Sequence, residues 1–213
     1  MIQDLTELAN SFLGWIETFT SSPWFYAVLF AVAFLDSIIP IVPSETSVIL
    51  GGIAAGQGEL SIILVIAIAA FGAFLGDSAA YGLGNRFSDR IRGVLFRGEK
   101  GDDRLMRAGD QIRKRGGLLL ITARFVPGGR TALTFSCGLT QQPYKSWFLR
   151  WDIIAVIIWA SYAGLLGFFF GDRFEDDHTT AFWWAFGTAL SVTLLIEVVR
   201  WVRGRLAPEP ASH

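Results

Sequence analysis

The chain is poor in the residues that build disulfides, metal centres and histidine-based active sites. It has one cysteine, Cys137, so an internal disulfide and a cysteine cluster for metal are excluded, and we expect a small packing residue there. Its two histidines are His178, in a predicted loop, and His213, the last residue. Metal binding and histidine-based catalysis are therefore not expected, and we predict no cofactor and no enzymatic function.

Basic residues are missing from the chain before Arg86. The segment 84–116 then carries ten lysines and arginines against five acids, which predicts a cytoplasmic segment because basic residues are enriched in inside loops. The acidic loop 172–177 is expected outside, and the basic C-terminal tail inside. With a net charge of −1, the charge balance gives no indication of a nucleic-acid partner.

Long apolar runs are abundant, and 52% of the residues are hydrophobic. The runs 60–84, 151–171 and 181–199 are each long enough, at about 1.5 Å per residue, to cross a hydrocarbon layer of ~30 Å. Residues 1–22 place apolar side chains at helical spacing and predict an amphipathic helix at the outer interface. The sequence therefore predicts an all-α, multi-pass integral membrane protein.

The segment 117–143 is expected to enter and leave the membrane on the same side. Both its flanks are basic and hence cytoplasmic, and its 27 residues are too few for two crossings of about 20 residues each. It predicts a re-entrant helical hairpin in which Pro127, Gly128 and Gly129 break the helix near the tip.

The segment 23–58 predicts a second hairpin, which enters from the outside. It carries no basic residue and holds Pro40 and Pro43 at its centre. A full crossing by 23–39, with the N-terminus inside, is the alternative. Because each hairpin is followed by one span, the sequence predicts an inverted repeat of two oppositely oriented units, as in many transporters.

The predicted units follow one another along the chain. The sequence does not decide between a monomer and a homodimer. The units are the amphipathic helix 1–22, the first hairpin and transmembrane helix 23–84, the basic cytoplasmic helical segment 85–116, the second hairpin and transmembrane helix 117–171, and the outer loop, last transmembrane helix and cytoplasmic tail 172–213.

Few charges remain at membrane depth once the loop charges are set aside. Arg124 and Arg130 flank the break of the second hairpin, and Glu45 follows the prolines of the first. A charge at the centre of a membrane helix costs ~2.5–3.5 kcal/mol, so these groups need partners, water or a ligand. We expect the two arginines to bind a phosphate, helped by a helix that begins at Thr131. Glu45 and Asp77 are expected to exchange protons or to act as charge partners.

Three other acids receive no functional role. Asp36, Asp152 and Glu197 lie near predicted interfaces, and we expect them to be solvated or to snorkel. An alternative for the whole set of charges is structural: Glu45 and Asp77 would pair with the arginines only to hold the two hairpins together.

Small residues surround Asp77. Ala73, Asp77, Tyr81 and Gly84 fall on one helical face, and Gly76 belongs to a pattern of small residues four apart. Helix packing is therefore the expected role of Gly76 and Tyr81. A carboxylate on such a face is costly, so Asp77 itself is expected to be functional.

Three motifs resemble those of the DedA family of bacterial inner-membrane proteins, which is related to eukaryotic lipid scramblases. They are PSE at 43–45, GDSAAYGLG at 76–84, and RFVPGGR at 124–130 followed by Gly138. The resemblance covers residues 30–170, nearly the whole hydrophobic part of the chain.

The resemblance implies two facing re-entrant hairpins in a bacterial cytoplasmic membrane, with functional roles for Glu45, Asp77, Arg124 and Arg130. It also implies envelope maintenance that depends on the proton-motive force. Some members are understood to return undecaprenyl phosphate across the membrane, whereas others are linked to different phospholipids or to small anions.

The leading hypothesis is a proton-coupled flippase for a polyprenyl phosphate or related phospholipid, with anionic lipid, protons and the bilayer as partners. The lipid tail would stay in the bilayer beside a groove between the two hairpins. The alternatives are a proton-coupled small-ion transporter, a non-transporting envelope scaffold, and a lipid phosphatase, which the lack of histidine near the arginines disfavours.

Overall fold

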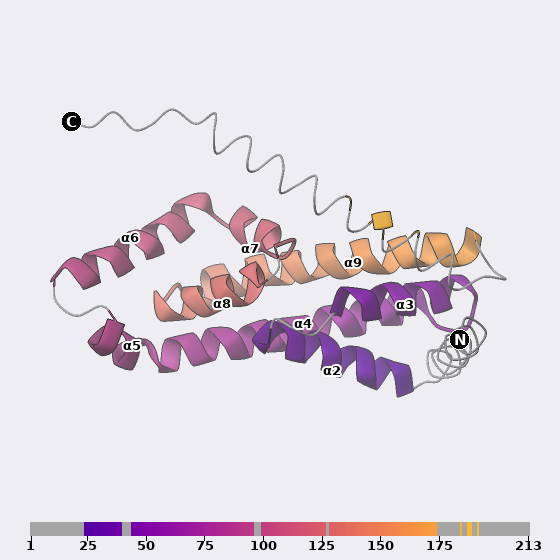
Figure 1. Ribbon diagram of the computed structural model, residues 1–213, viewed down its shortest axis with the longest axis horizontal. Helices are drawn as coiled ribbons and strands as arrows, with labels where there is room; N and C mark the ends of the chain where they lie inside the picture. The colour runs from indigo at the N-terminus through magenta and orange to yellow at the C-terminus, as the bar shows by residue number, and fades with distance from the viewer. Residues whose placement is uncertain are drawn as a thin grey trace, which may run out of the picture.

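The computed structural model describes residues 24–39, 44–95, 99–126 and 128–173, together with residues 184, 187, 188 and 191. Every regular element among them is helical (Figure 1), so the all-α prediction is confirmed for this part of the chain. Several predicted features lie outside the described residues: the amphipathic helix 1–22, Pro40, Pro43, Pro127, most of the span 181–199, Glu197 and the basic tail.

Two long helices run antiparallel through the molecule (Figure 1). Helix α4 covers Ile62–Arg86, and α9 covers Leu149–Arg173 directly after a π-helical turn at Tyr144–Phe148. Both are long and apolar enough to cross a membrane, since 25 residues extend about 37 Å. The predicted spans 60–84 and 151–171 are thus confirmed as long apolar helices.

The outer faces of these helices are apolar. Exposed Ile63 and Phe71 project from α4, and exposed Ile157 and Phe169 from α9. A run of large exposed apolar side chains is unusual in a water-soluble protein and suits contact with lipid.

Two pairs of shorter helices fill the space beside the long ones. The first pair is α2 (Trp24–Ile38) and α3 (Ser44–Gly56), and the second is α7 (Leu118–Ala123) and α8 (Gly129–Leu139). In Figure 1, α2 runs inward from one end of the molecule and α3 returns toward it, whereas α7 and α8 do the same from the opposite end. The inner ends of the two pairs meet near the middle.

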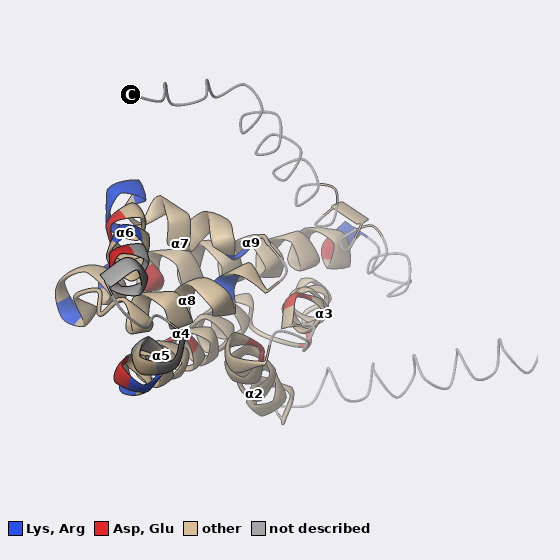
Figure 2. Ribbon diagram, turned by 60° about the vertical axis from the view of Figure 1, so that its left-hand side comes forward, with Lys and Arg blue, Asp and Glu red and all other residues tan. Residues whose placement is uncertain are grey.

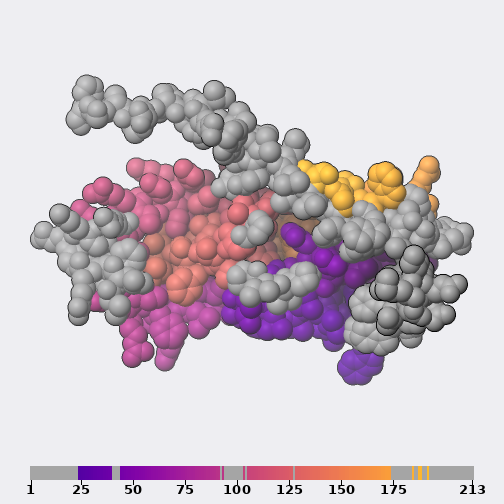
Figure 3. All heavy atoms as spheres, viewed as in Figure 1, coloured from indigo at the N-terminus to yellow at the C-terminus, as the bar shows by residue number. Residues whose placement is uncertain are grey.

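The two pairs pack on the long helices in a related manner. Helix α2 lies on α4 and α3 on α9, whereas α7 lies on α9 and α8 on α4. The first helix of each pair therefore contacts the long helix that follows it in sequence, and the second contacts the other long helix. The space-filling view shows the α2–α3 pair (indigo) and the α7–α8 pair (salmon) offset along the molecule (Figure 3).

Glycines allow the backbones at these contacts to approach closely. A Cβ at Gly52 of α3 would meet the backbone of α9, and a Cβ at Gly167 of α9 would meet that of α3. The same relation joins Gly84 of α4 and Gly138 of α8, while Gly76 lies against the backbone of α2. Close backbone approach through small residues is the usual way in which membrane helices associate.

The basic segment forms α5 (Ser88–Leu95) and α6 (Glu99–Arg115) at one end of the molecule. Figure 2 shows lysine, arginine and acidic residues gathered on these two helices. The side-chain amide of Gln142, just after α8, donates to the carbonyl of Gly109 in α6 at 3.1 Å, and its backbone carbonyl accepts from the Tyr81 hydroxyl. Tyr81 therefore helps to tie α4 to the turn that α6 contacts.

Candidate functional site

Six ionisable side chains gather where the inner ends of the two helix pairs meet. Each comes from a different segment: Asp36 of α2, Glu45 of α3, Asp77 of α4, Arg124 directly after α7, Arg130 of α8, and Asp152 of α9. Asp77, Asp152 and both arginines are buried, and no other charged side chain among the described residues is buried.

The break between α7 and α8 presents the two arginines to this cluster. Successive amides from Arg124 to Val126 bond carbonyls three residues back, so the helix tightens before it ends. Gly128 has φ +70°, a conformation that glycine adopts at little cost. Helix α8 begins at Gly129, two residues before the expected start at Thr131, and Arg130 therefore lies in its first turn.

Arg124 is held by two aspartates. Its Nη2 atom donates to Asp77 and also to the Oδ1 atom of Asp152, at 3.0 Å. Asp77 and Asp152 are fully buried, and the Arg124 side chain is 2% exposed. Removing one partner from a buried pair of this kind leaves an uncompensated charge, so Arg124 is fixed in place.

Arg130 has partners that are easier to reach. Its Nη2 atom donates to Asp36 Oδ2 at 2.7 Å, and its Nε lies 3.7 Å from Asp77 Oδ1. The side chain of Asp36 is 18% exposed and also accepts a hydrogen bond from the Ser44 hydroxyl. Of the two arginines, Arg130 therefore has the more exchangeable partner.

Trp159 of α9 lies against both arginines. Its ring centroid is 6.0 Å from the guanidinium carbon of Arg124 and 5.7 Å from that of Arg130, which suits cation–π attraction, and the residue is buried. The Glu45 carboxylate interacts with the Trp159 indole and with the charges of Arg130 and Asp36. Tyr162, one turn further along α9, also faces Glu45.

The cluster is short of positive charge, and the cluster and the adjacent Tyr162 are short of hydrogen-bond partners. Four carboxyl groups face two guanidinium groups, so full ionisation would leave an excess of two negative charges. Four buried polar atoms of the cluster have no hydrogen-bond partner among the described protein atoms: Asp77 Oδ1, Asp152 Oδ2, Arg124 Nη1 and Tyr162 Oη. Buried polar atoms are nearly always satisfied, so the site suits protons or a polar ligand.

The roles expected for Asp36 and Asp152 are wrong. Asp152 is fully buried because the helix that carries it already begins at Tyr144, so this aspartate lies inside the molecule rather than at an interface. Asp36 lies in the last turn of α2, which ends near the middle of the molecule, and it pairs with Arg130. Glu45 is exposed and forms no ion pair with the described arginines.

Trp159 was missed by the sequence analysis, although a signal was present. Asp152, Val156, Trp159 and Ala163 recur at helical spacing on α9, and all four are buried. On α4, the expected face of Ala73, Asp77, Tyr81 and Gly84 is likewise buried. Cys137 is fully buried in an apolar cluster with Tyr81 and Phe148.

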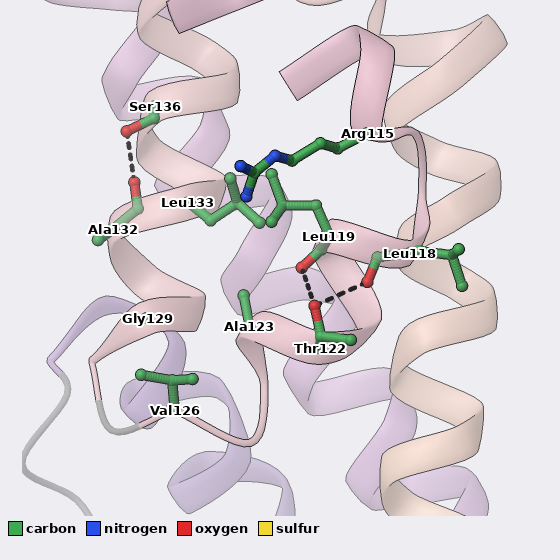
Figure 4. A pocket seen from close by; sticks show the side chains of 10 residues that line it. All are labelled: Arg115, Leu118, Leu119, Thr122, Ala123, Val126, Gly129, Ala132, Leu133 and Ser136. Carbon is green, nitrogen blue, oxygen red and sulfur yellow. Dashed lines mark hydrogen bonds between the residues drawn. The ribbon is translucent and has the colours of Figure 1, made fainter. Parts of the chain in front are cut away.

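An open groove of about 510 Å³ lies between α7 and α8, within the second helix pair (Figure 4). Helix α7 and the break after it supply Leu118, Leu119, Thr122, Ala123 and Val126; α8 supplies Gly129, Ala132, Leu133 and Ser136; and the end of α6 supplies Arg115.

Comparison with known proteins places the chain in a family. The VTT domain matches residues 42–169, which include Glu45, Asp77 and both arginines. Protein DedA of Escherichia coli (strain K12) is 26% identical over 157 residues, which cover 70% of this chain and 69% of that protein. The inner membrane protein YohD of the same organism is 31% identical over 175 residues, 79% of this chain and 87% of YohD.

A third relative has a transport function in its name. Undecaprenyl phosphate transporter A of Staphylococcus aureus is 29% identical over 157 residues, which cover 70% of this chain and 75% of that protein. No solved structure matches the chain. The domain match and the relatives together show that the chain belongs to the DedA family of VTT-domain membrane proteins.

Proposed function

We propose that this protein moves a phosphate-bearing lipid, a polyprenyl phosphate such as undecaprenyl phosphate or a related phospholipid, across the bacterial cytoplasmic membrane with proton coupling. The observation that carries the proposal is the cluster of two arginines and four acids, four of these six groups buried, at the meeting point of two helix pairs. The name of the Staphylococcus aureus relative supports a lipid phosphate as the substrate.

In the proposed topology, α2–α3 and α7–α8 are re-entrant hairpins and not spans. Helices α2, α3, α7 and α8 have 15, 13, 6 and 11 residues. Each is too short to cross the membrane, which takes about 20 residues. The basic segment 85–116 would lie in the cytoplasm, so α7–α8 would enter from inside and α2–α3 from outside. The cluster would then lie near the midplane, where broken helices are tolerated beside a polar site.

The two arginines would divide the work. Arg130 would bind the phosphate after leaving Asp36, because this pair is the more exposed one and a guanidinium fork matches phosphate oxygens. The first turn of α8 adds amides without intrahelical partners beside Arg130. Arg124, held by Asp77 and Asp152, would keep the site assembled.

Protonation would couple phosphate binding to the proton gradient. A proton on Asp36 or Glu45 removes a negative charge that competes with the phosphate for Arg130, and loss of that proton favours release. The excess of carboxyl groups over guanidinium groups gives the site the capacity to carry such protons.

Trp159 would link Glu45 to the arginine pair. Its ring lies against both guanidinium groups, and its indole N–H can donate a hydrogen bond to Glu45. A change in the charge of Glu45 would thus alter the phosphate site through the rigid side chain of Trp159.

Purified protein in liposomes tests the proposal. We expect a labelled polyprenyl phosphate in the outer leaflet to become inaccessible to an added phosphatase faster than in protein-free liposomes, and faster still with a proton gradient. A lipid whose accessibility is the same with and without protein would refute lipid transport.

Two other functions make different predictions. A small-ion transporter would move inorganic anions with protons and leave the lipid in place. A scaffold, which the two ion pairs of Arg124 favour, would tolerate exchange of the residues at positions 36 and 130, which form an ion pair, whereas an anion site would be lost. Release of inorganic phosphate from lipid by the purified protein would indicate an enzyme instead.

A further inference from the structure

We infer that the groove between α7 and α8 binds one anionic lipid, with a hydrocarbon chain along the groove and the phosphate against Arg115. This inference rests on the proposed lipid transport. The groove would hold the lipid at the cytoplasmic surface before transport. A lipid held there would approach the charged cluster along the second hairpin.

The walls of the groove suit an apolar chain. They consist mainly of leucine, valine, alanine and glycine. The two hydroxyls in the lining are already bonded within their own helices, Thr122 to the Leu118 carbonyl at 2.9 Å and Ser136 to the Ala132 carbonyl at 2.7 Å (Figure 4). Since these hydroxyls have acceptors of their own, the walls offer little to a polar headgroup and much to a hydrocarbon chain.

The mouth of the groove suits an anion. Arg115 is exposed, forms no ion pair with any described residue, and extends its side chain across the groove toward Leu133 (Figure 4). Its neighbour Lys114 is also exposed, whereas Arg113 donates to Gln142 at 3.5 Å.

Charge, and not apolarity, would make the site selective. Lipid chains in the bilayer are as apolar as leucine, so the walls alone would favour no particular lipid. One basic residue near the surface favours anionic over neutral lipid by about fivefold.

One end of the groove lies at the break between α7 and α8. The lining ends at Val126 and Gly129, on either side of the break, and Arg130 follows Gly129 directly. Between Gly129 and Ser136 the groove extends about 10 Å along α8, and its volume lies within the ~300–1,000 Å³ usual for small-molecule sites. It would therefore hold part of one chain while the headgroup remains at Arg115.

Lipid retention by the purified full chain tests the site. The protein is incubated with vesicles of equal parts phosphatidylglycerol and phosphatidylcholine, extracted in mild detergent, and analysed by native mass spectrometry. We expect one retained lipid with an about fivefold preference for phosphatidylglycerol. Arg115→Ala should remove this preference and Ala132→Trp should remove the lipid, whereas Lys114→Ala and Ala31→Trp, which change exposed residues outside the groove, should retain both.

Three results would overturn the site. The first is equal retention of both lipids by the unaltered protein, and the second is lipid retention unaffected by Ala132→Trp. The third is a quantitative disulfide between cysteines introduced at Ala132 and Thr188, because a segment of the chain itself would then fill the groove. None of these depends on transport: a protein that flips lipid but retains none in the groove would keep the proposed function and lose this site.

Discussion

Replacing Arg130 by lysine separates a bidentate anion ligand from a simple positive charge. Arg130 uses two different nitrogens in the structure, Nη2 toward Asp36 and Nε toward Asp77. A lysine ammonium keeps the charge but loses the fork, so one charge-assisted hydrogen bond to a bound phosphate is lost. Such a bond contributes ~1.5–3 kcal/mol, and we expect transport by Arg130→Lys to fall about 10- to 150-fold.

Arg124→Lys is the matched control, because both of its ion pairs are made by the single atom Nη2. One ammonium can take the place of that atom, and we expect transport to fall less than tenfold. Arg124→Leu should behave differently again. It leaves Asp152 buried without its described counter-charge, and Asp77 with only the longer 3.7 Å contact to Arg130, at a cost of ~3–5 kcal/mol, and should lower the melting temperature and the yield of folded protein.

The assay is phosphatase protection of a labelled polyprenyl phosphate in proteoliposomes, measured beside the melting temperature of each variant in detergent. Wild-type transport by Arg130→Lys, at equal protein content, would show that no bidentate contact is made. Equal losses for the two lysine variants, with unchanged melting temperatures, would contradict the division of roles between the arginines.

Five further variants, at four positions, probe the coupling and the packing. Glu45→Gln should leave downhill lipid flipping intact but make it indifferent to a proton gradient; a gradient response equal to that of the wild type would contradict coupling through this residue. Trp159→Phe keeps an aromatic ring and should mainly alter the response to the proton gradient. Trp159→Leu loses the cation–π attraction, ~0.5–2 kcal/mol for each arginine, and should weaken phosphate-lipid binding about 2- to 30-fold for each. Equal binding by both variants would argue against a cation–π role. Gly84→Ala should lower the melting temperature, at a cost of ~1–3 kcal/mol, because its Cβ meets the backbone of α8. Gly82→Ala, which meets open space, should not, and similar melting temperatures for the two would refute the close contact.

The sequence was informative about which charges matter because the chain has few of them at membrane depth. Arg124, Arg130 and Asp77 stand in apolar segments and in motifs of the DedA family, and the structure brings all three into contact. The long helices were equally predictable, since an uninterrupted apolar run of about 20 residues has few other conformations open to it in a bilayer.

The pairing of the charges could not be predicted in the same way. Arg130 contacts Asp36 and not Glu45 because α2 ends beside α8, whereas Glu45 lies in the first turn of α3 and remains exposed. That choice depends on how two helices far apart in sequence are set against each other, which hydrophobic periodicity does not encode. The position of Asp152 was predicted wrongly, near an interface, because the apolar run begins at residue 151. The helix begins at Tyr144, so Asp152 lies well inside it.

The exchange of helices between the two halves makes neither half self-sufficient. A fragment ending after α5 would contain α3 without α9, and Gly52 would lose the backbone against which it fits. The fragment beginning at α6 would contain α8 without α4, with Gly138 exposed in the same way. The two fragments should accordingly be insoluble or degraded when made alone, yet assemble into one particle when made together, each completing the other as two different subunits would.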